Sequence, residues 1–137
     1  MNFLKQKYKD DKRVSFIDPV GTHEISKKIN EYDIGIYILP PLNFNNINAL
    51  PNKFFEFIQG RLAVAIGPMP AMAEIVKRYS LGVVAQDYTS RSLATAIKNL
   101  SRENIYKCKK NAEAAAMELS EEKNKQTLLE EIKKLSN

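Results

Sequence analysis

Short apolar runs divide the chain, and each run is continuous rather than alternating. Four have the length of a strand: residues 14–17, 34–39, 63–66 and 82–85. Continuous runs of Val, Ile and Ala are typical of strands that are covered on both faces, as in a parallel sheet. A fifth run, from Phe54 to Ile58, is interrupted by Glu56 and fits a helix better. The pattern therefore predicts a parallel sheet of about four strands.

Helical periodicity fills the intervals between the runs. The segment 22–31 begins with the capping residue Thr22 and places Ile25 and Ile29 four positions apart. Gly60 stands where the helix 52–59 should stop. Further helices are predicted at residues 71–79, at 89–100 and from 101 to the end of the chain. This alternation predicts right-handed βαβ crossovers, and hence an α/β fold with helices flanking a parallel sheet.

The length of 137 residues fits one domain. A basic segment, 1–12, precedes the first apolar run, and the helices of 101–137 form a C-terminal tail. In an open parallel sheet, ligands bind beyond the carboxyl ends of the strands. The segments that follow Ile17, Leu39 and Ile66 are therefore the informative ones for function.

The net charge of +5 lies at the margins of the folded region rather than in its middle. Residues 1–13 carry five basic and two acidic groups, and residues 98–110 carry five and one. No recognition element or aromatic grouping accompanies these cations, so a nucleic-acid partner ranks last among the hypotheses. Solvated helix faces explain the charge best, and a basic rim that faces anionic lipid or an acidic partner stays open.

The compartment predicted from the sequence is the cytoplasm, with at most a peripheral contact at the inner face of the membrane. No apolar run approaches the roughly 18 residues of a membrane helix, and the charged start does not resemble a signal peptide. Cys108 is the single cysteine, so no disulfide framework exists. Because no spacing of Cys, His, Asp and Glu fits a metal site, neither a metal nor a cofactor is expected.

Glu56 is the residue that most needs a chemical explanation. It follows a long Asn-rich loop, 40–51, and lies in the first turns of a helix with two apolar residues on each side. A helix N-terminus favours an ionised carboxylate, whose two acceptor oxygens suit a vicinal diol such as that of a ribose. Lys53 and free N–H groups at the same helix start suit a phosphate. On the residues alone, however, a solvated Lys53 and a Glu56 that only complements the helix dipole are the simpler interpretation.

Three other polar residues are candidates for a functional role. His23, the only histidine, begins a helix, where a catalytic base is conceivable but a surface histidine is more common. Cys108 has cationic neighbours but no partner base, so a structural role is expected. Glu74 is expected to be a solvated helix residue rather than a residue of the ligand cleft.

Several stretches, in order, resemble glycosyltransferases similar to family 4. Leu50–Val64 resembles the Pro-Asn-Lys-Leu-Phe-Glu-Tyr…Gly-x-Pro-Val stretch of that family, and Tyr32–Ile36 resembles its Tyr-x-x-Ala-Asp-Ile-Gly-Ile strand entry. Val14–Val20 resembles its Val-x-Phe-x-Gly-x-Val segment, and Pro70–Val76 with Leu81–Val84 resembles its Pro-x-x-x-Glu-Ile-Val…Gly-x-x-Val segment. The resemblance covers roughly residues 12–135.

The resemblance implies the donor-binding, Rossmann-like C-terminal domain of a bacterial-type enzyme with two such domains (GT-B). Such an enzyme transfers a sugar from a nucleotide donor to an acceptor, usually with retention, in glycan or polysaccharide biosynthesis, and it needs no bound metal. Glu56 would then hold the ribose. Pro51, Asn52 and Lys53 would lie beside the diphosphate or the sugar. The base would lie near the loop formed by Asp18, Pro19, Val20 and Gly21.

Two departures from the family pattern limit these expectations. The wider family often has another glutamate eight residues before the one that matches Glu56. Asn48 occupies that position here. The family's domain also opens with further βα units, and its acceptor-binding domain precedes them. We therefore expect this chain to bind a nucleotide sugar, to need a missing half or another chain, and to be inactive alone. The alternative is a non-catalytic α/β protein-interaction module or an inactive remnant.

Overall fold

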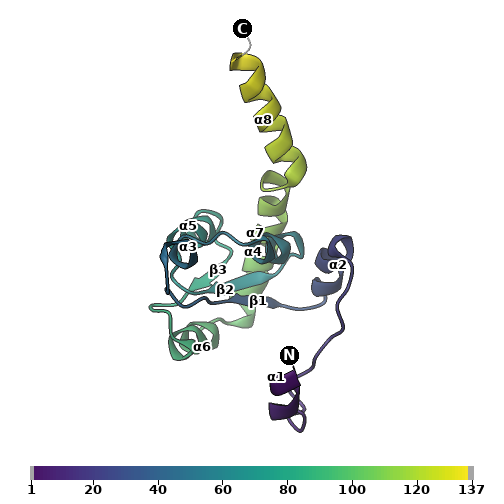
Figure 1. Ribbon diagram of the computed structural model, residues 1–137, viewed down its shortest axis with the longest axis vertical. Helices are drawn as coiled ribbons and strands as arrows, with labels where there is room; N and C mark the ends of the chain where they lie inside the picture. The colour runs from purple at the N-terminus through teal and green to yellow at the C-terminus, as the bar shows by residue number, and fades with distance from the viewer. Residues whose placement is uncertain (1, 136–137) are drawn as a thin grey trace.

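The computed structural model describes residues 2–135 and shows a small α/β domain with one extension at each end (Figure 1). Its strands are β1 (Ile34–Tyr37), β2 (Ala63–Ile66) and β3 (Gly82–Val84). The helices before β2 are α1 (Asn2–Lys7), the 3-10 turn η1 (Thr22–Glu24), α2 (Ile25–Ile29), α3 (Phe44–Ile47) and α4 (Asn52–Gln59). Those after it are α5 (Pro70–Tyr79), α6 (Ser90–Lys98), α7 (Arg102–Glu118) and α8 (Glu121–Leu135).

The three strands form one parallel sheet in the order β1-β2-β3. Ile34 lies beside Ala63, and Val64 lies beside Gly82. The two crossovers are α4 and α5, as the strand–helix alternation predicts. The prediction of a parallel α/β sheet flanked by helices is confirmed, but the sheet has three strands rather than about four.

The first predicted strand, Val14–Ile17, is wrong. Residues 14–20 are exposed and have no regular secondary structure, and the backbone N–H of Val14 donates to the Asp11 carbonyl of a local turn. The apolar run has the right composition for a strand, but a strand also needs a neighbour for its ladder hydrogen bonds. In the described part of the chain, no strand lies beside this segment.

The core sits on both faces of β2, all four residues of which are completely buried. On one face, Phe54 and Ile58 of α4 pack with the buried alanines of α7 and with apolar residues of α5. On the other face, Leu93 of α6 packs against Ala65 and Ala85. Figure 1 shows α4 and α5 above the sheet, α6 below it, and α7 passing behind it.

Local signals set most helix boundaries as expected. The helix 52–59 is confirmed, Pro70 begins α5, and Thr89 caps α6 by accepting a hydrogen bond from the N–H of Ser92. Gly60 ends α4 with a negative φ, and the left-handed conformation falls on the next residue, Arg61. The C-terminal helical region is divided near Ser120 into α7 and α8, and α8 projects away from the domain (Figure 1).

Replacement of Gly82 by alanine is expected to destabilise the fold strongly. An added Cβ would overlap the Val64 carbonyl oxygen of the neighbouring strand, and backbone atoms of a buried strand cannot move aside. We expect Gly82→Ala to lower the free energy of unfolding by about 3 kcal/mol. Urea denaturation, followed by circular dichroism, measures the free energy of unfolding. The control is Gly21→Ala, whose Cβ would meet only the exposed side-chain ends of Glu24 and His23. Equal losses in both variants would contradict this packing.

Candidate functional site

A hollow of about 560 Å³ surrounds the polar side of α4. It lies between the start of the η1–α2 segment, α4 and the junction of α7 with α8. Its lining side chains are mainly hydroxyls, amides and carboxylates: Thr22, Ser26, Asn52, Phe55, Glu56, Gln59, Leu119, Ser120 and Glu122. Two residues from the sequence hypothesis, Asn52 and Glu56, therefore line the same hollow.

Helical spacing explains why Glu56 faces this hollow. Phe54 and Ile58 are one turn apart and completely buried, so they fix the face of α4 that packs on the sheet. Asn52, Glu56 and Gln59 follow at intervals of four and three, so they share a different face. The core residues of α4 thus direct a half-buried Glu56 toward the hollow.

Two long-range hydrogen bonds hold the walls of the hollow against α4. The side-chain amide of Asn30, just after α2, donates to the Gly60 carbonyl over 2.9 Å. The side-chain amide of Gln59 donates to the Ala116 carbonyl of α7, also over 2.9 Å. Ile29 packs closely against Gly60, where a Cβ would have no room. These contacts fix α2 beside α4 and α7 behind it.

The charge of the hollow is negative. Glu56 and Glu122 line it, and none of its lining residues is a lysine, an arginine or a histidine. Within residues 2–135, the Glu56 carboxylate makes no hydrogen bond or ion pair with another side chain. Its oxygens are therefore ready to accept hydrogen bonds from a ligand. Because the carboxylates repel anions, the hollow suits hydroxyl or amine donors better than phosphate.

Three residues of the sequence hypothesis lie outside the lining of the hollow. Pro51 is the half-buried N-cap of α4, and no side chain caps this helix start. Lys53, in the first turn, is exposed to solvent. Asn48 follows α3, and its side-chain amide donates to the Phe44 carbonyl over 2.9 Å. Pro51 and Lys53 remain adjacent to the hollow along the chain, whereas Asn48 belongs to the loop in front of it.

The expected base-side loop is exposed and extended. Asp18, Pro19, Val20 and Gly21 are all exposed, and the Gly21 N–H lies 3.3 Å from the Glu24 carboxylate at the start of η1. The loop reaches the hollow only through the next residue, Thr22.

Sequence reasoning missed most of the walls of the hollow. Ser26 comes from α2, while Ser120 and Glu122 come from the other end of the chain. No local pattern marks these residues as neighbours of Glu56, because their approach depends on helix packing. The amphipathic spacing of α4 is the one signal that could have identified Gln59.

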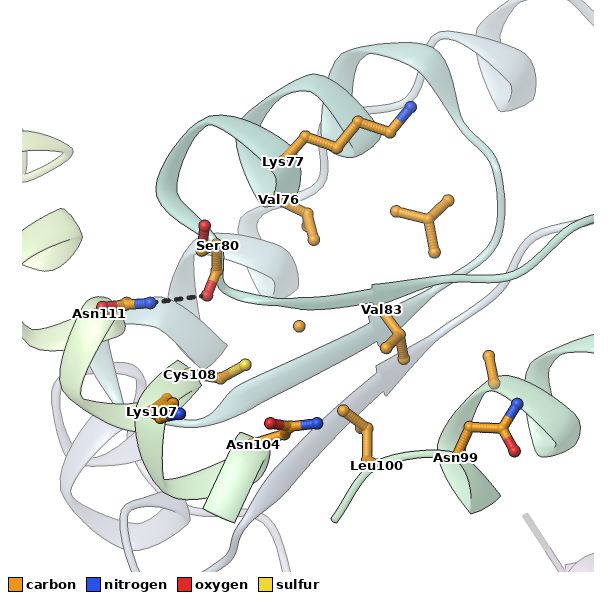
Figure 2. A pocket seen from close by; sticks show the side chains of 13 residues that line it. Val76, Lys77, Ser80, Val83, Asn99, Leu100, Asn104, Lys107, Cys108 and Asn111 are labelled. Atoms are coloured by element: carbon orange, nitrogen blue, oxygen red, sulfur yellow. Dashed lines mark hydrogen bonds between the residues drawn. The ribbon is translucent and has the colours of Figure 1, made fainter. Parts of the chain in front are cut away.

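A second hollow, of about 720 Å³, lies beside β3 at the other edge of the sheet. Figure 2 shows Val83 and Leu100 on its walls together with Cys108 and Asn104 of α7. The Asn111 amide that borders it already donates to the Ser80 carbonyl over 3.0 Å. This hollow is a mainly apolar seam between helices and does not bring together groups for chemistry.

His23 and Glu74, two further candidates from the sequence, have the surroundings of surface groups. His23 is exposed, and Glu74 is exposed and forms an ion pair of 2.7 Å with Arg78. Among residues 2–135, no group of three or more His, Cys, Asp and Glu residues is placed to hold a metal ion. In the same range, no helix has both the length and the apolar character needed to cross a membrane.

Cys108 is expected to react slowly with thiol reagents. Burial raises the pKa of its thiol, because the thiolate loses hydration in the seam beside β3. At neutral pH the folded chain should therefore react several-fold more slowly with a disulfide reagent than the chain unfolded in urea. Absorbance of the released thiol measures both rates. A folded rate equal to or above the unfolded rate would contradict this assignment.

Comparisons with known proteins return no match. No protein-family model, no curated protein and no solved structure is similar to this chain at the level required. The glycosyltransferase resemblance therefore stands on the sequence motifs alone. The function has to be argued from the hollow around Glu56.

Proposed function

We propose that the chain binds a nucleotide sugar and forms the donor-binding portion of a glycosyltransferase. The observation that carries this proposal is the placement of Glu56. Its half-buried carboxylate lines a hollow with three hydroxyl groups and two amides, and has no partner of its own in the described protein. Such a set accepts and donates hydrogen bonds to the vicinal hydroxyls of a ribose or a sugar.

The chemistry of α4 favours one orientation of this ligand. The hydroxyl-bearing part would occupy the hollow, where the carboxylates repel phosphate. The diphosphate would lie outside it, at the uncapped start of α4 and near Lys53, where free N–H groups and a cation favour negative charge. This orientation keeps the roles that the resemblance implies for Glu56, Asn52 and Lys53.

Transfer would need more than these residues. The hollow supplies positions for the donor, and the walls around it contain no acceptor site that the structure identifies. An oxygen nucleophile and its general base would come from the acceptor-binding half or from another chain. This chain therefore contributes donor binding and charge stabilisation at the leaving diphosphate.

The binding site is tested by titration of the full chain with UDP, GDP, ADP and their common sugar conjugates, followed by calorimetry or amide shifts. We expect one base to bind saturably. Glu56→Gln should weaken it by roughly 10- to 100-fold, since a hydrogen bond to a charged group contributes about 1.5–3 kcal/mol. Glu74→Gln, an exposed carboxylate on α5, is the matched control and should leave affinity unchanged. Absence of binding at millimolar concentration by a folded chain would refute the proposal.

The orientation has its own test. Lys53→Gln should weaken binding of the nucleoside diphosphate but leave that of the nucleoside unchanged, whereas Glu56→Gln should weaken both. The Lys53 effect should shrink at high salt, because the exposed ammonium and the phosphate are screened. An equal loss for nucleoside and diphosphate in Lys53→Gln would place the phosphate elsewhere.

A non-catalytic protein-interaction module is the second candidate. One observation favours it: the sheet ends at β1 in an edge that no described strand covers, and Ile36 on that strand is 53% exposed. A folded chain that fails to bind any nucleotide but associates through this edge would support this candidate instead.

A further inference from the structure

The outer edge of β1 is an unprotected sheet edge. β1 pairs with β2 on one side only, and no described strand lies on its other side. Ile34 and Ile38 pack with the core beneath the sheet, yet Ile36 between them is 53% exposed. The strand contains no lysine or proline that would discourage pairing. Such an edge is a template for another strand.

Helix α2 precedes β1 in the chain and is not part of the sheet. It packs mainly against α4, and the bond from Asn30 to Gly60 holds the two helices together. Figure 1 shows α2 beyond the end of the sheet at which β1 begins. No described strand lies between α2 and the outer edge of β1.

The chain itself carries a segment with the character of the missing strand. Residues 3–20, called the arm, project from the domain and end near α2 (Figure 1). Within the arm, Val14, Phe16 and Ile17 are 38%, 40% and 51% exposed. The backbone hydrogen bonds that involve residues 8–14 of the arm are local to it. The arm thus holds an apolar, extended run without a partner strand in the described structure.

We propose that the chain forms a symmetric dimer in which each copy places residues 14–17 of its arm beside β1 of the other. In each copy the outer edge of β1 and the segment 14–17 both lack a partner strand among the described residues, so a two-fold exchange satisfies both. The arm leads away from its own sheet, and Pro19 stiffens its link to α2. A second copy is therefore the occupant of the edge.

The residue pattern fixes the register of this exchange. With the two strands parallel and Val14 beside Ile34, Phe16 lies beside Ile36 and covers its exposed side chain. Arg13 then lies beside Asp33 at the strand entrance. Both groups are exposed in the present structure, where each has another partner, Asp11 and Lys109 respectively, and exposed pairs exchange at little cost.

Sedimentation or light scattering of the full chain over a wide concentration range tests the exchange. The wild type is expected to be a dimer. Phe16→Lys and Ile36→Glu should each raise the dimer dissociation constant by about tenfold or more, because the buried apolar contact is lost. Leu128→Lys, at an exposed apolar position on α8, is the control and should leave the dimer intact. Circular dichroism checks that each variant is folded.

Mixing the two variants gives the decisive result. In a dimer of one Phe16→Lys chain and one Ile36→Glu chain, one interface has the two introduced charges facing each other and the other interface is wild type. Mixing should therefore restore dimers, which pairing of the arm with its own sheet cannot produce. A monomeric wild type, a dimer that neither variant weakens, or variants that do not dimerise on mixing would each overturn the exchange.

Discussion

The complete burial of β2 is the constraint on which the rest of the fold depends. Its backbone groups have no access to water, so each needs a hydrogen-bond partner on a neighbouring strand. β1 supplies these partners on one side and β3 on the other, and Gly82 lets β3 approach the Val64 carbonyl. The helices then cover the two faces, because the apolar side chains of the strands point to both.

Among the described strands, the outer side of β1 lacks the hydrogen-bonding partner that β2 has on both sides. The segment that precedes β1 in the chain also forms part of the candidate site. β1 has a neighbour on one side only, and α2 lies past it beside α4. Thr22 and Ser26 of this η1–α2 segment form one wall of the hollow around Glu56. The segment that leads into Thr22 is the arm. In the proposed dimer, the arm that reaches the partner therefore leads directly into Thr22 at the hollow of its own copy.

Local sequence signals determined most of the elements that pack together. The apolar runs at 34–37, 63–66 and 82–84 became strands, and the four-residue spacing of Phe54 and Ile58 defined the buried face of α4. Thr89 fixed the beginning of α6 through its hydroxyl group. These signals act between residues a few positions apart, so they can be recognised in the sequence without knowledge of the fold. The orientation of Glu56 away from the core follows from the same spacing.

Contacts between distant segments were decided only by the tertiary structure. The run Val14–Ile17 has the composition of a strand but no adjacent strand to bond with, so it stays exposed. The left-handed residue after α4 is Arg61 rather than Gly60. The tertiary structure requires glycine at position 60 for another reason, because a Cβ there would overlap the Ile29 side chain of α2. The hollow joins Ser26 and Ser120 to Glu56 through helix packing. Sequence fixes periodicity along one element, whereas a site formed between elements depends on where each is held.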